Sequence, residues 1–351
     1  MKLGIFLPNW IGDVAMATPT LRALRGHFGP EAQLIGILRP YVADVLAGTA
    51  WLNDQVFHHP RSKDPQQRTA AVAGKLRSLK LDSVVLLTNS LRTGLMAWAS
   101  GARQRVGFVR YGRGFCLTTR LYHPRQGRRY LPVSAIDCYL QLAYALACPP
   151  ESRHLELATL DSDERRADAV WKKLGLPSGD QVVVLNSGGA FGAAKLWPSE
   201  YFAALAARIA RDEQLSVLVN CGPSERKVAA EIVRLAKHPC VVSLAEEEVP
   251  LGLTKAAIRR SRLLVTTDSG PRFFGVAFGV PVVSLFGPTH VNWSRTHWAG
   301  ELCLHRDVPC GPCMRHTCPL GHHRCMRDLS VDDVYAAVQR QLGRGRKFVA
   351  A

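Results

Sequence analysis

The chain has 351 residues, of which 47% are hydrophobic and 21% charged, as in a globular protein long enough to form two domains. No apolar stretch approaches the ~20 residues that a membrane span needs, and the amino terminus has the pattern of a strand rather than a signal peptide, so we expect a cytoplasmic protein. Forty-five Lys and Arg against 28 Asp and Glu give a formal charge of +17, which favours nucleic acid, an anionic membrane face or a phosphorylated substrate as the partner.

The first half of the chain alternates apolar and amphipathic segments, as a doubly wound α/β domain does. The predicted elements are strands at 2–7, 33–38 and 83–87 and helices at 14–27, 41–47 and 68–79. Asp13 follows Pro8-Asn9-Trp10-Ile11-Gly12, where the first strand gives way to the first helix. Such sheets bind ligands at the carboxyl ends of their strands, so a carboxylate here is placed to accept a proton. The alternative is that Asp13 only caps its helix.

Polar and basic residues follow the strand that ends near residue 87. Asn89 and Ser90 come directly after it, and two basic clusters come next. The clusters comprise Arg103, Arg105, Arg110 and Arg113, and then Arg120, Arg125, Arg128 and Arg129. Most of the remaining excess charge is scattered over amphipathic stretches, which is typical of a solvated surface.

After a polar, proline-bearing segment at about 148–163, the α/β pattern restarts. The predicted elements are helices at 164–174, 199–211, 224–237, 271–278 and 330–342 and strands at 181–186, 216–220, 263–267 and 280–286. The sequence therefore predicts two Rossmann-like domains that face a central cleft. The predicted divisions are 1–155, then 156–330 with a cysteine-rich loop at 303–325, then a C-terminal helix and tail at 331–351.

Each predicted strand of the second half ends in small or polar residues. The four clusters are Asn186-Ser187-Gly188-Gly189, Cys221-Gly222-Pro223-Ser224-Glu225, Thr267-Asp268-Ser269-Gly270-Pro271 and Phe286-Gly287-Pro288-Thr289. Clusters at successive strand ends form one crevice, where helix amino termini hold phosphate and a carboxylate holds sugar hydroxyls. The chain has no GxGxxG and no GxxxxGK[ST] motif, which disfavours a simple dinucleotide dehydrogenase or a P-loop nucleotidase.

Two charged residues lie beside these clusters. Lys195 precedes a predicted helix and could neutralise a diphosphate, or it could be an ordinary surface lysine. Glu225 lies at the first turn of its helix, where it could bond a ribose diol or only complement the helix dipole.

Four segments resemble one known family. They are FLPNWIGDVAMATPTLRAL, TNSLRTGLMAWASGARQRVGF, NSGGAFGAAKLWP, and TTDSGP followed by GVPVVSLFGPT. Together they resemble the ADP-heptose:lipopolysaccharide heptosyltransferases, most closely heptosyltransferase II. The resemblance implies an α/β fold of the GT-B class and inverting transfer of L-glycero-D-manno-heptose from ADP-heptose to the inner core of lipopolysaccharide.

The resemblance also implies roles for individual residues. Asp13 would be the general base that takes the proton of the acceptor hydroxyl. Donor binding would involve Ser187, Gly188, Gly189, Lys195, Glu225, Asp268, Ser269 and Gly270, and acceptor binding Asn89, Ser90, Arg110 and Arg113. Among the donor residues, Glu225 would contact the ribose and Asp268 the heptose. Lys195 and the backbone amides of 188–191 and 269–270 would meet the charge of the departing diphosphate.

The implied partners are acidic. The acceptor is a lipid A inner-core glycolipid, and peripheral attachment to the anionic inner-membrane surface on its cytoplasmic face would account for the excess of Lys and Arg. Catalysis would need no cofactor, and no nucleic acid partner is expected.

The chain departs from the family pattern at Phe273. Family members usually have His five residues after the position of Asp268, and Phe cannot donate a hydrogen bond to a diphosphate or sugar. Arg272 is a candidate replacement. The departure keeps open an alternative, a related GT-B transferase with a different nucleotide-sugar or acceptor.

Four cysteines near the end of the chain have the spacing C-x2-C-x4-C-x6-C. They are Cys310, Cys313, Cys318 and Cys325, with His316, His322 and His323 nearby. The spacing is compatible with a structural zinc site; the alternatives are reduced loop thiols or an occasional disulfide. Thioredoxin-like chemistry is disfavoured because Pro319 interrupts the long helix that such a motif opens.

The cysteines and the charge together leave a second class of function, a basic nucleic-acid-binding protein with a zinc module. The aromatic residues do not interleave with Lys and Arg as a platform for single strands requires, which weighs against it.

Overall fold

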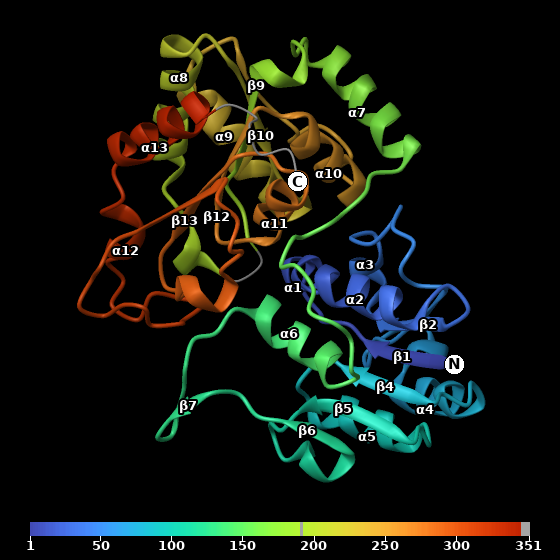
Figure 1. Ribbon diagram of the computed structural model, residues 1–351. Helices are drawn as coiled ribbons and strands as arrows, with labels where there is room; N and C mark the ends of the chain where they lie inside the picture. The colour runs from blue at the N-terminus through green and yellow to red at the C-terminus, as the bar shows by residue number, and fades with distance from the viewer. Residues whose placement is uncertain (190–191, 345–351) are drawn as a thin grey trace. The chain divides into compact units, whose positions relative to one another are not determined.

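The computed structural model describes residues 1–189 and 192–344. The chain divides into two compact units (Figure 1). Unit 1 comprises Met1–Leu157 and Asn292–Arg295, and unit 2 comprises Ala158–Val291 and Thr296–Ala351. Residues 190–191 and 345–351, including part of the predicted tail, lie outside the described residues.

Unit 1 is built on a parallel sheet. Its strands are β1 (Lys2–Phe6), β2 (Gln33–Leu38), β3 (Asp54–Phe57), β4 (Ser83–Leu86), β5 (Gln104–Phe108) and β6 (Thr119–Leu121). They lie in the order β3-β2-β1-β4-β5-β6, and every neighbouring pair is parallel. The chain order reverses between β1 and β4, which makes the carboxyl ends of these two strands the switch point where Rossmann-like sheets bind ligands.

The helices of unit 1 cover this sheet. They are α1 (Ile11–Met16), α2 (Thr18–Phe28), α3 (Pro40–Ala43), α4 (Thr69–Ser78), α5 (Leu91–Ala99) and α6 (Ala135–Tyr144), with 3-10 turns η1 (Pro65–Gln67) and η2 (Arg113–Cys116). Helix α6 packs against α1 and α2, and α4 packs against α5. Apolar residues of β1, β2, β4, α4 and α5 form one buried cluster. A short antiparallel hairpin, β7 (Arg125–Gln126) and β8 (Arg129–Tyr130), is separate from the main sheet.

The predicted helix at 14–27 is two helices in the structure. α1 begins three residues earlier than predicted, and the chain breaks at Ala17 before α2 starts. The reason is Pro19, which lacks an N–H and lies in the first turn of α2, a position that suits proline. Asp13 therefore lies inside a short helix instead of directly before a long one.

Unit 2 repeats the topology of unit 1. Its strands are β9 (Val182–Asn186), β10 (Ser216–Asn220), β11 (Val241–Ser243), β12 (Leu263–Thr267), β13 (Val282–Phe286) and β14 (Glu301–His305). They lie in the order β11-β10-β9-β12-β13-β14, again all parallel, with the switch point between β9 and β12. β9 is buried along its whole length, as its apolar run predicts for a strand covered on both faces.

Two groups of helices pack in unit 2. The helices are α7 (Asp161–Lys173), α8 (Ser199–Asp212), α9 (Arg226–Ala236), α10 (Leu251–Arg260), α11 (Gly270–Ala277), α12 (Arg324–Arg327) and α13 (Val331–Arg344), with 3-10 turns η3 (Gly179–Gln181), η4 (Ala193–Lys195) and η5 (Pro223–Glu225). A further 3-10 turn, η6 (Val291–Ser294), begins at the last residue of the first segment of unit 2 and continues in the residues assigned to unit 1. Helix α10 packs against α7 and α11, and α8 packs against α9 and α13. Helix α13 also contacts β12, β13 and β14, so the last helix belongs to unit 2. The α/β class and the pair of parallel sheets confirm the predicted fold class.

Candidate functional site

A buried amide connects the strand ends at the switch point of unit 2. Asn186 is the last residue of β9, and its Nδ2 lies 3.2 Å from the carbonyl oxygen of Gly188 and 3.1 Å from both Thr266 Oγ1 and Ser269 Oγ. Its Oδ1 accepts a hydrogen bond of 2.9 Å from Asn220, the last residue of β10. The segments that follow three strands are thereby held at one edge of the sheet. The sequence analysis placed Asn186 in one of the strand-end clusters but assigned it no role.

The glycine loop after β9 packs tightly against its neighbours. A Cβ on Gly188 would lie 2.0 Å from the carboxylate carbon of Glu225, and one on Gly189 would lie 3.3 Å from Ser269 Cβ. Any side chain at position 188 would therefore displace the Glu225 carboxylate from the place it occupies over the loop. Glu225 Oε2 accepts a hydrogen bond of 2.7 Å from Gly222 N, so this residue holds its own turn together while it covers the loop.

The structure describes part of the rest of this loop. Ser187 is buried, and its Oγ has no hydrogen-bond partner among residues 1–189 and 192–344. Of the predicted amide donors at 188–191, residues 190 and 191 lie outside the described residues.

A network of buried charges lies beside this loop. Lys195 Nζ donates to Asp268 Oδ2 at 2.7 Å and to the carbonyl oxygen of Asp268 at 2.8 Å. Thr289 donates to the same carboxylate at 2.7 Å, and Arg272 Nη1 lies 3.3 Å from its other oxygen. Arg272 also forms a two-point ion pair with Glu301, whose second contact measures 3.0 Å. The network therefore contains two cations and two carboxylates, whose formal charges sum to zero.

The charges set the ionisation of both acids. Burial favours the neutral form of Asp268, but Lys195 and Arg272 hold the pKa of this carboxyl below its usual value. Burial likewise opposes ionisation of Glu301, and Arg272, with hydrogen bonds from hydroxyl groups, keeps its pKa low. Lys195 and Asp268 thus form an ion pair with no net charge. A diphosphate would therefore have to share the ammonium group of Lys195 with this carboxylate.

Arg272 and Phe273 belong to the packed interior. Arg272 is fully buried, and its guanidinium carbon lies 4.9 Å from the ring centre of Phe273 and 4.8 Å from that of Phe286. Because its donors are used by Glu301 and Asp268, Arg272 does not replace the family histidine in this structure. Phe273 is buried, and its ring packs against the guanidinium group of Arg272.

Asp13 lies at the switch point of unit 1 with a tyrosine as its partner. It is the third residue of α1, and Trp10 occupies the N-cap position, so Asp13 does not cap this helix. Tyr139, from α6, donates a hydrogen bond of 3.2 Å to Asp13 Oδ1. Burial and the nearby carboxylate raise the pKa of Tyr139 well above its usual value, so the phenol stays protonated as a donor. The two residues are 126 positions apart, which is why sequence patterns missed Tyr139.

The Tyr139→Phe variant is expected to keep its fold and to lose activity at acidic pH first. Without the phenol, the Asp13 carboxylate loses a hydrogen bond that favours its charged form, so the acid limb of the kcat/KM profile should move to higher pH by up to about 1 unit. The pH–rate profile of the catalysed reaction measures this. An unchanged profile would mean that Tyr139 only packs α6 against α1.

The four predicted acceptor residues have different environments. Ser90 caps α5 by accepting a hydrogen bond of 3.2 Å from Thr93 N. Arg113 is fully buried, where it donates to Phe108 O at 2.9 Å and to Asn89 Oδ1 at 3.1 Å, and burial lowers its pKa to about 10. Arg113 therefore orients Asn89 and does not present its charge to solvent, in contrast to its predicted role as a direct acceptor contact.

Arg110 is the fourth of these residues. Its guanidinium carbon lies 4.3 Å from the ring centre of Tyr130 and 5.0 Å from that of Tyr111. This stacking fixes a cation next to the β7–β8 hairpin.

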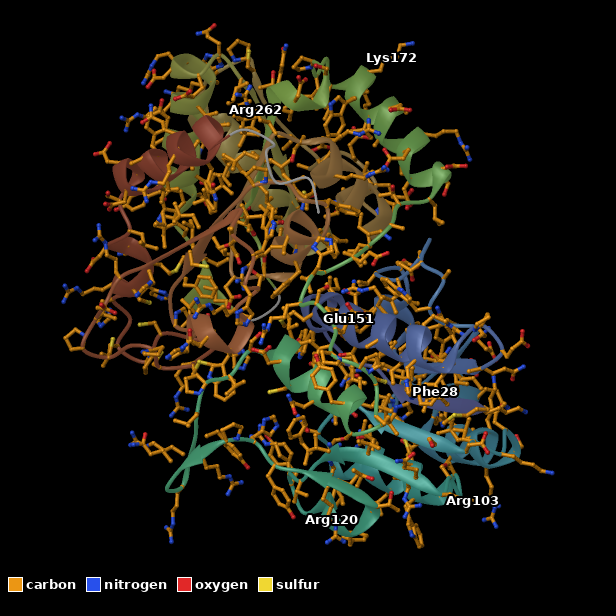
Figure 2. The ribbon with its side chains drawn as sticks, in the orientation of Figure 1. Phe28, Arg103, Arg120, Glu151, Lys172 and Arg262 are labelled. Carbon is orange, nitrogen blue, oxygen red and sulfur yellow. The ribbon has the colours of Figure 1, made fainter. Side chains whose placement is uncertain are left out.

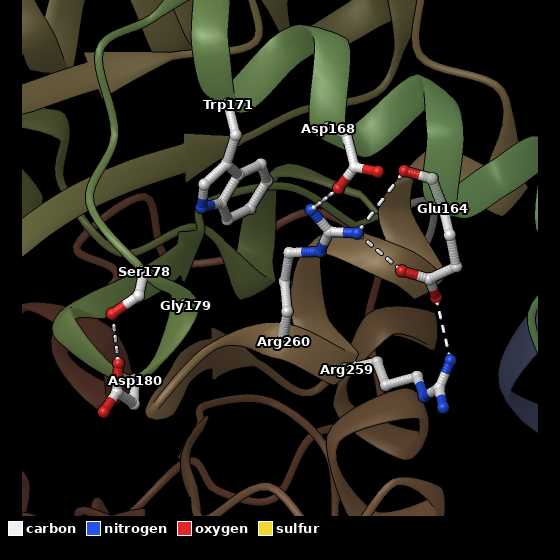
Figure 3. A pocket seen from close by; sticks show the side chains of 8 residues that line it. All are labelled: Glu164, Asp168, Trp171, Ser178, Gly179, Asp180, Arg259 and Arg260. Atoms are coloured by element: carbon white, nitrogen blue, oxygen red, sulfur yellow. Dashed lines mark hydrogen bonds and ion pairs between the residues drawn. The ribbon is translucent and has the colours of Figure 1, made fainter.

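A separate open cavity of about 680 Å³ lies at the opposite edge of unit 2 (Figure 3). It is bordered by α7, α10 and the turn that precedes β9, so it lies at the amino end of that strand. Arg260 is paired there with Glu164 at 2.5 Å and with Asp168 at 2.9 Å, and Arg259 contacts Glu164 at 2.9 Å. Because both arginines are neutralised by α7, this cavity is a poor candidate for a diphosphate site.

Comparison with known proteins gives a consistent picture. Residues 69–324 match the family described as glycosyltransferase family 9 (heptosyltransferase). The chain is 26% identical over 337 residues to lipooligosaccharide heptosyltransferase 2 of Campylobacter jejuni subsp. jejuni serotype O:2, covering 95% of this chain and 96% of the relative. It is 24% identical over 306 residues to lipopolysaccharide heptosyltransferase 2 of Escherichia coli strain K12, covering 84% and 85%. The solved structure of E. coli ADP-heptose lps heptosyltransferase II has the same fold, with a TM-score of 0.78, 20% identity and coverage of 98% and 99%.

Proposed function

Because the chain belongs to glycosyltransferase family 9 (heptosyltransferase), we propose that it moves L-glycero-D-manno-heptose from ADP-heptose to the inner core of lipopolysaccharide, as a heptosyltransferase II-like enzyme. It is a glycosyltransferase with the GT-B fold. The observation that carries the choice of chemistry is Asp13, a carboxylate at the carboxyl end of β1 that Tyr139 holds in place.

In the proposed reaction Asp13 accepts the proton of the acceptor hydroxyl. The hydroxyl oxygen attacks the anomeric carbon of the heptose, the new glycosidic bond forms, and the bond to the diphosphate breaks. ADP leaves with the electron pair of that bond, so negative charge grows on its terminal phosphate. Inversion follows because the acceptor attacks the face opposite the leaving group.

The donor is assigned to the switch point of unit 2. Gly188 and Gly189 pack closely against Glu225 and Ser269, and the amide groups of Ser269 and Gly270 lie at the start of α11, where a diphosphate can be bound. Lys195 would share its ammonium group between Asp268 and the diphosphate, while Asp268 would turn an oxygen to the heptose. Glu225, which covers Gly188, would meet the ribose. In this proposal the protein itself meets the leaving-group charge, and transfer needs no catalytic metal.

The test is acceptor-dependent release of the donor's nucleoside diphosphate, ADP or UDP, by the purified chain. A lipid A core acceptor is supplied with ADP-heptose, and in parallel with ADP-glucose and UDP-glucose as matched donors. Acceptor-dependent release with ADP-heptose, and with neither of the two glucose donors, would support the proposal. Faster release from another nucleotide-sugar would mean that ADP-heptose is not the donor. This is the alternative that Phe273 keeps open. If the chain bound ADP-heptose but released no nucleoside diphosphate with any core acceptor, the proposed acceptor would be wrong.

We further propose that unit 1 works at the anionic, cytoplasmic face of the inner membrane. Among the described residues, no helix has the length and apolar character to cross a bilayer. The hairpin β7–β8 instead stands away from the main sheet (Figure 1) and combines cations with rings. Arg110 and Arg125 both stack on Tyr130, at 4.3 and 4.2 Å from its centre.

The surface around this hairpin supports an interfacial role. Tyr111, Phe115 and Tyr122 expose 69%, 64% and 69% of their surface. Arg120, on β6, projects outward from the edge of unit 1 (Figure 2). Aromatic rings with arginines suit a boundary where apolar lipid meets phosphate groups.

The paired variant Arg128→Glu/Arg129→Glu should weaken binding to vesicles of anionic phospholipid by more than about tenfold, because each arginine near such a surface contributes about 1 kcal/mol. Sedimentation with vesicles at low and high salt measures it. The control is Arg165→Glu/Lys172→Glu, the same charge change at two exposed positions of α7, of which Lys172 is labelled in Figure 2. Equal loss in both variants would show that total charge, not the hairpin, holds the protein at the surface.

A further inference from the structure

The cysteine-rich loop of unit 2 surrounds a small cavity. Among the residues that line it are Cys310, Cys313, Cys318, Cys325 and His322. The cavity measures about 50 Å³, so it has room for a single ion or water molecule and not for an organic ligand. All four cysteines are free thiols and partly buried.

The four cysteines border the same cavity from three parts of one loop. Four thiolates around so small a space would repel one another unless a cation lay between them.

The neighbouring histidine helps to choose the ligand set. Arg324 N donates to His322 Nδ1 at 3.0 Å, which leaves the proton of a neutral imidazole on Nε2. That nitrogen lies 3.8 Å from Cys310 Sγ, where it donates to sulfur. His322 is therefore an outer hydrogen-bond donor, as residues around metal ligands commonly are, and the four cysteines are left as the ligands.

The loop packs against both segments that hold the buried charges. Ala194 N donates to the carbonyl oxygen of His316 at 3.1 Å, one residue before Lys195. Met314 N donates to Pro288 O at 2.8 Å, one residue before Thr289. A Cβ on Gly287 would come within 3.4 Å of Cys325 Sγ. The conformation of the cysteine loop thus sets the position of the residues that hold Asp268.

We propose that Cys310, Cys313, Cys318 and Cys325 bind one thiolate-preferring transition-metal ion, zinc or iron, and that the bound ion fixes the loop against the segments carrying Lys195 and Thr289. Four sulfur ligands in a tetrahedron are the preferred environment of such ions, with metal–sulfur distances of about 2.3 Å for zinc. As the side chains stand, no three His, Cys, Asp or Glu residues in the described parts of the chain are close enough together to hold a metal. The proposal therefore requires the four cysteine side chains to rotate into the cavity that they border.

The binding step balances without oxidation or reduction. Four S–H bonds are replaced by four metal–sulfur bonds, and four protons pass to water. A divalent ion with four thiolates carries a formal charge of −2. Residues 303–327 contain four arginines and one acidic residue, so the surrounding loop offsets this charge.

Metal content tests the site directly. The chain, purified from cells supplied with both zinc and iron, should contain about one ion per molecule, and Co²⁺ added to the stripped protein should give the absorption bands of a tetrahedral thiolate complex. Cys310→Ser/Cys313→Ser should lose both signals. Cys240→Ser is the matched control, because Cys240 is an exposed thiol elsewhere in unit 2. Less than about a fifth of an ion per chain together with no cobalt–thiolate band in the wild type would overturn the proposal, and those two readouts need no folded variant.

The positioning part of the proposal rests on the proposed function, and a second measurement separates the two. Removing the metal should weaken ADP binding, measured by calorimetry without acceptor, by at least about fivefold, because displaced groups lose their alignment. Unchanged ADP affinity in the stripped protein would overturn the positioning role and leave the metal site standing. A metal-loaded chain that binds no ADP and transfers no heptose would instead overturn the proposed function.

Discussion

The Asp13→Asn variant should lose about 10²- to 10⁴-fold in kcat/KM for heptose transfer while its affinity for ADP stays within about twofold of the wild type. Asparagine has nearly the same shape and still accepts the hydrogen bond from Tyr139, but it cannot take a proton from the acceptor hydroxyl. The loss should therefore fall on kcat. Steady-state ADP release and calorimetric titration with ADP measure the two quantities separately.

Glu31→Gln is the matched control for this variant. Glu31 is exposed in unit 1, so the same loss of one negative charge there should leave transfer within about twofold, as surface substitutions usually do. If Asp13→Asn kept more than a tenth of the activity, another group would be the base. If it lost activity and ADP affinity together, the change would have disturbed more than proton transfer.

The Arg272→Met variant should lose about 3–5 kcal/mol in the free energy of unfolding, because it leaves buried carboxylates without their cation. Arg272 is fully buried between Glu301, Asp268 and the rings of Phe273 and Phe286. Methionine fills much of the volume but supplies no charge and no donor. Urea unfolding at pH 7 measures the change.

Arg260→Met provides the comparison for this effect. Arg260 also pairs with two carboxylates of unit 2, Glu164 and Asp168, but 20% of its side chain is exposed to water. Water stabilises the carboxylates that remain, so the expected loss is about 1 kcal/mol or less. Equal losses at the two positions would mean that burial does not determine the importance of these ion pairs.

The cost of Arg272→Met should shrink as the pH falls from 7 toward 4.5. In the wild type, the low pKa values of Asp268 and Glu301 mean that their ion pairs stabilise the fold above their ordinary pKa values and lose this contribution below about pH 4. Without Arg272, burial should raise the pKa of both carboxyls in the folded state, so a proton relieves the unpaired charge already in mildly acidic solution. Unfolding curves at several pH values test this. A constant difference would assign the cost to packing around the two phenylalanines.

The strand ends of unit 2 could be predicted because their signal is local. An apolar run followed by glycine, serine or asparagine predicts a buried strand and the turn after it, and parallel strands bring such turns to one edge. The structure places Gly188, Ser269 and Glu225 together at that edge. The hydrogen bonds of Asn186 that connect the turns depend on the side-chain positions of other strands, which no local pattern contains.

The burial of basic residues could not be predicted from the sequence. Arginine is almost always at least partly exposed in folded proteins. Arg113 has no acidic residue close to it in the sequence that would mark it as an exception, and Arg272 has only Asp268. Glu301, the main partner of Arg272, is 29 residues away on β14, a strand that the sequence patterns did not predict. The break between α1 and α2 did have a signal, since Thr18-Pro19 is typical of a helix start.

The repeated strand order suggests a route for engineering. Each unit carries its own switch point, with Asp13 and Asn89 at the ends of β1 and β4 in one, and Gly188 and Ser269 at the ends of β9 and β12 in the other. Within each unit, the residues assigned to one substrate are anchored by hydrogen bonds from that same unit. Under the proposed assignment of the acceptor to unit 1 and the donor to unit 2, we expect acceptor choice to be a modular property: exchanging loops of unit 1, the β7–β8 hairpin among them, with those of a relative should redirect the enzyme to a new glycolipid while its sugar donor stays the same.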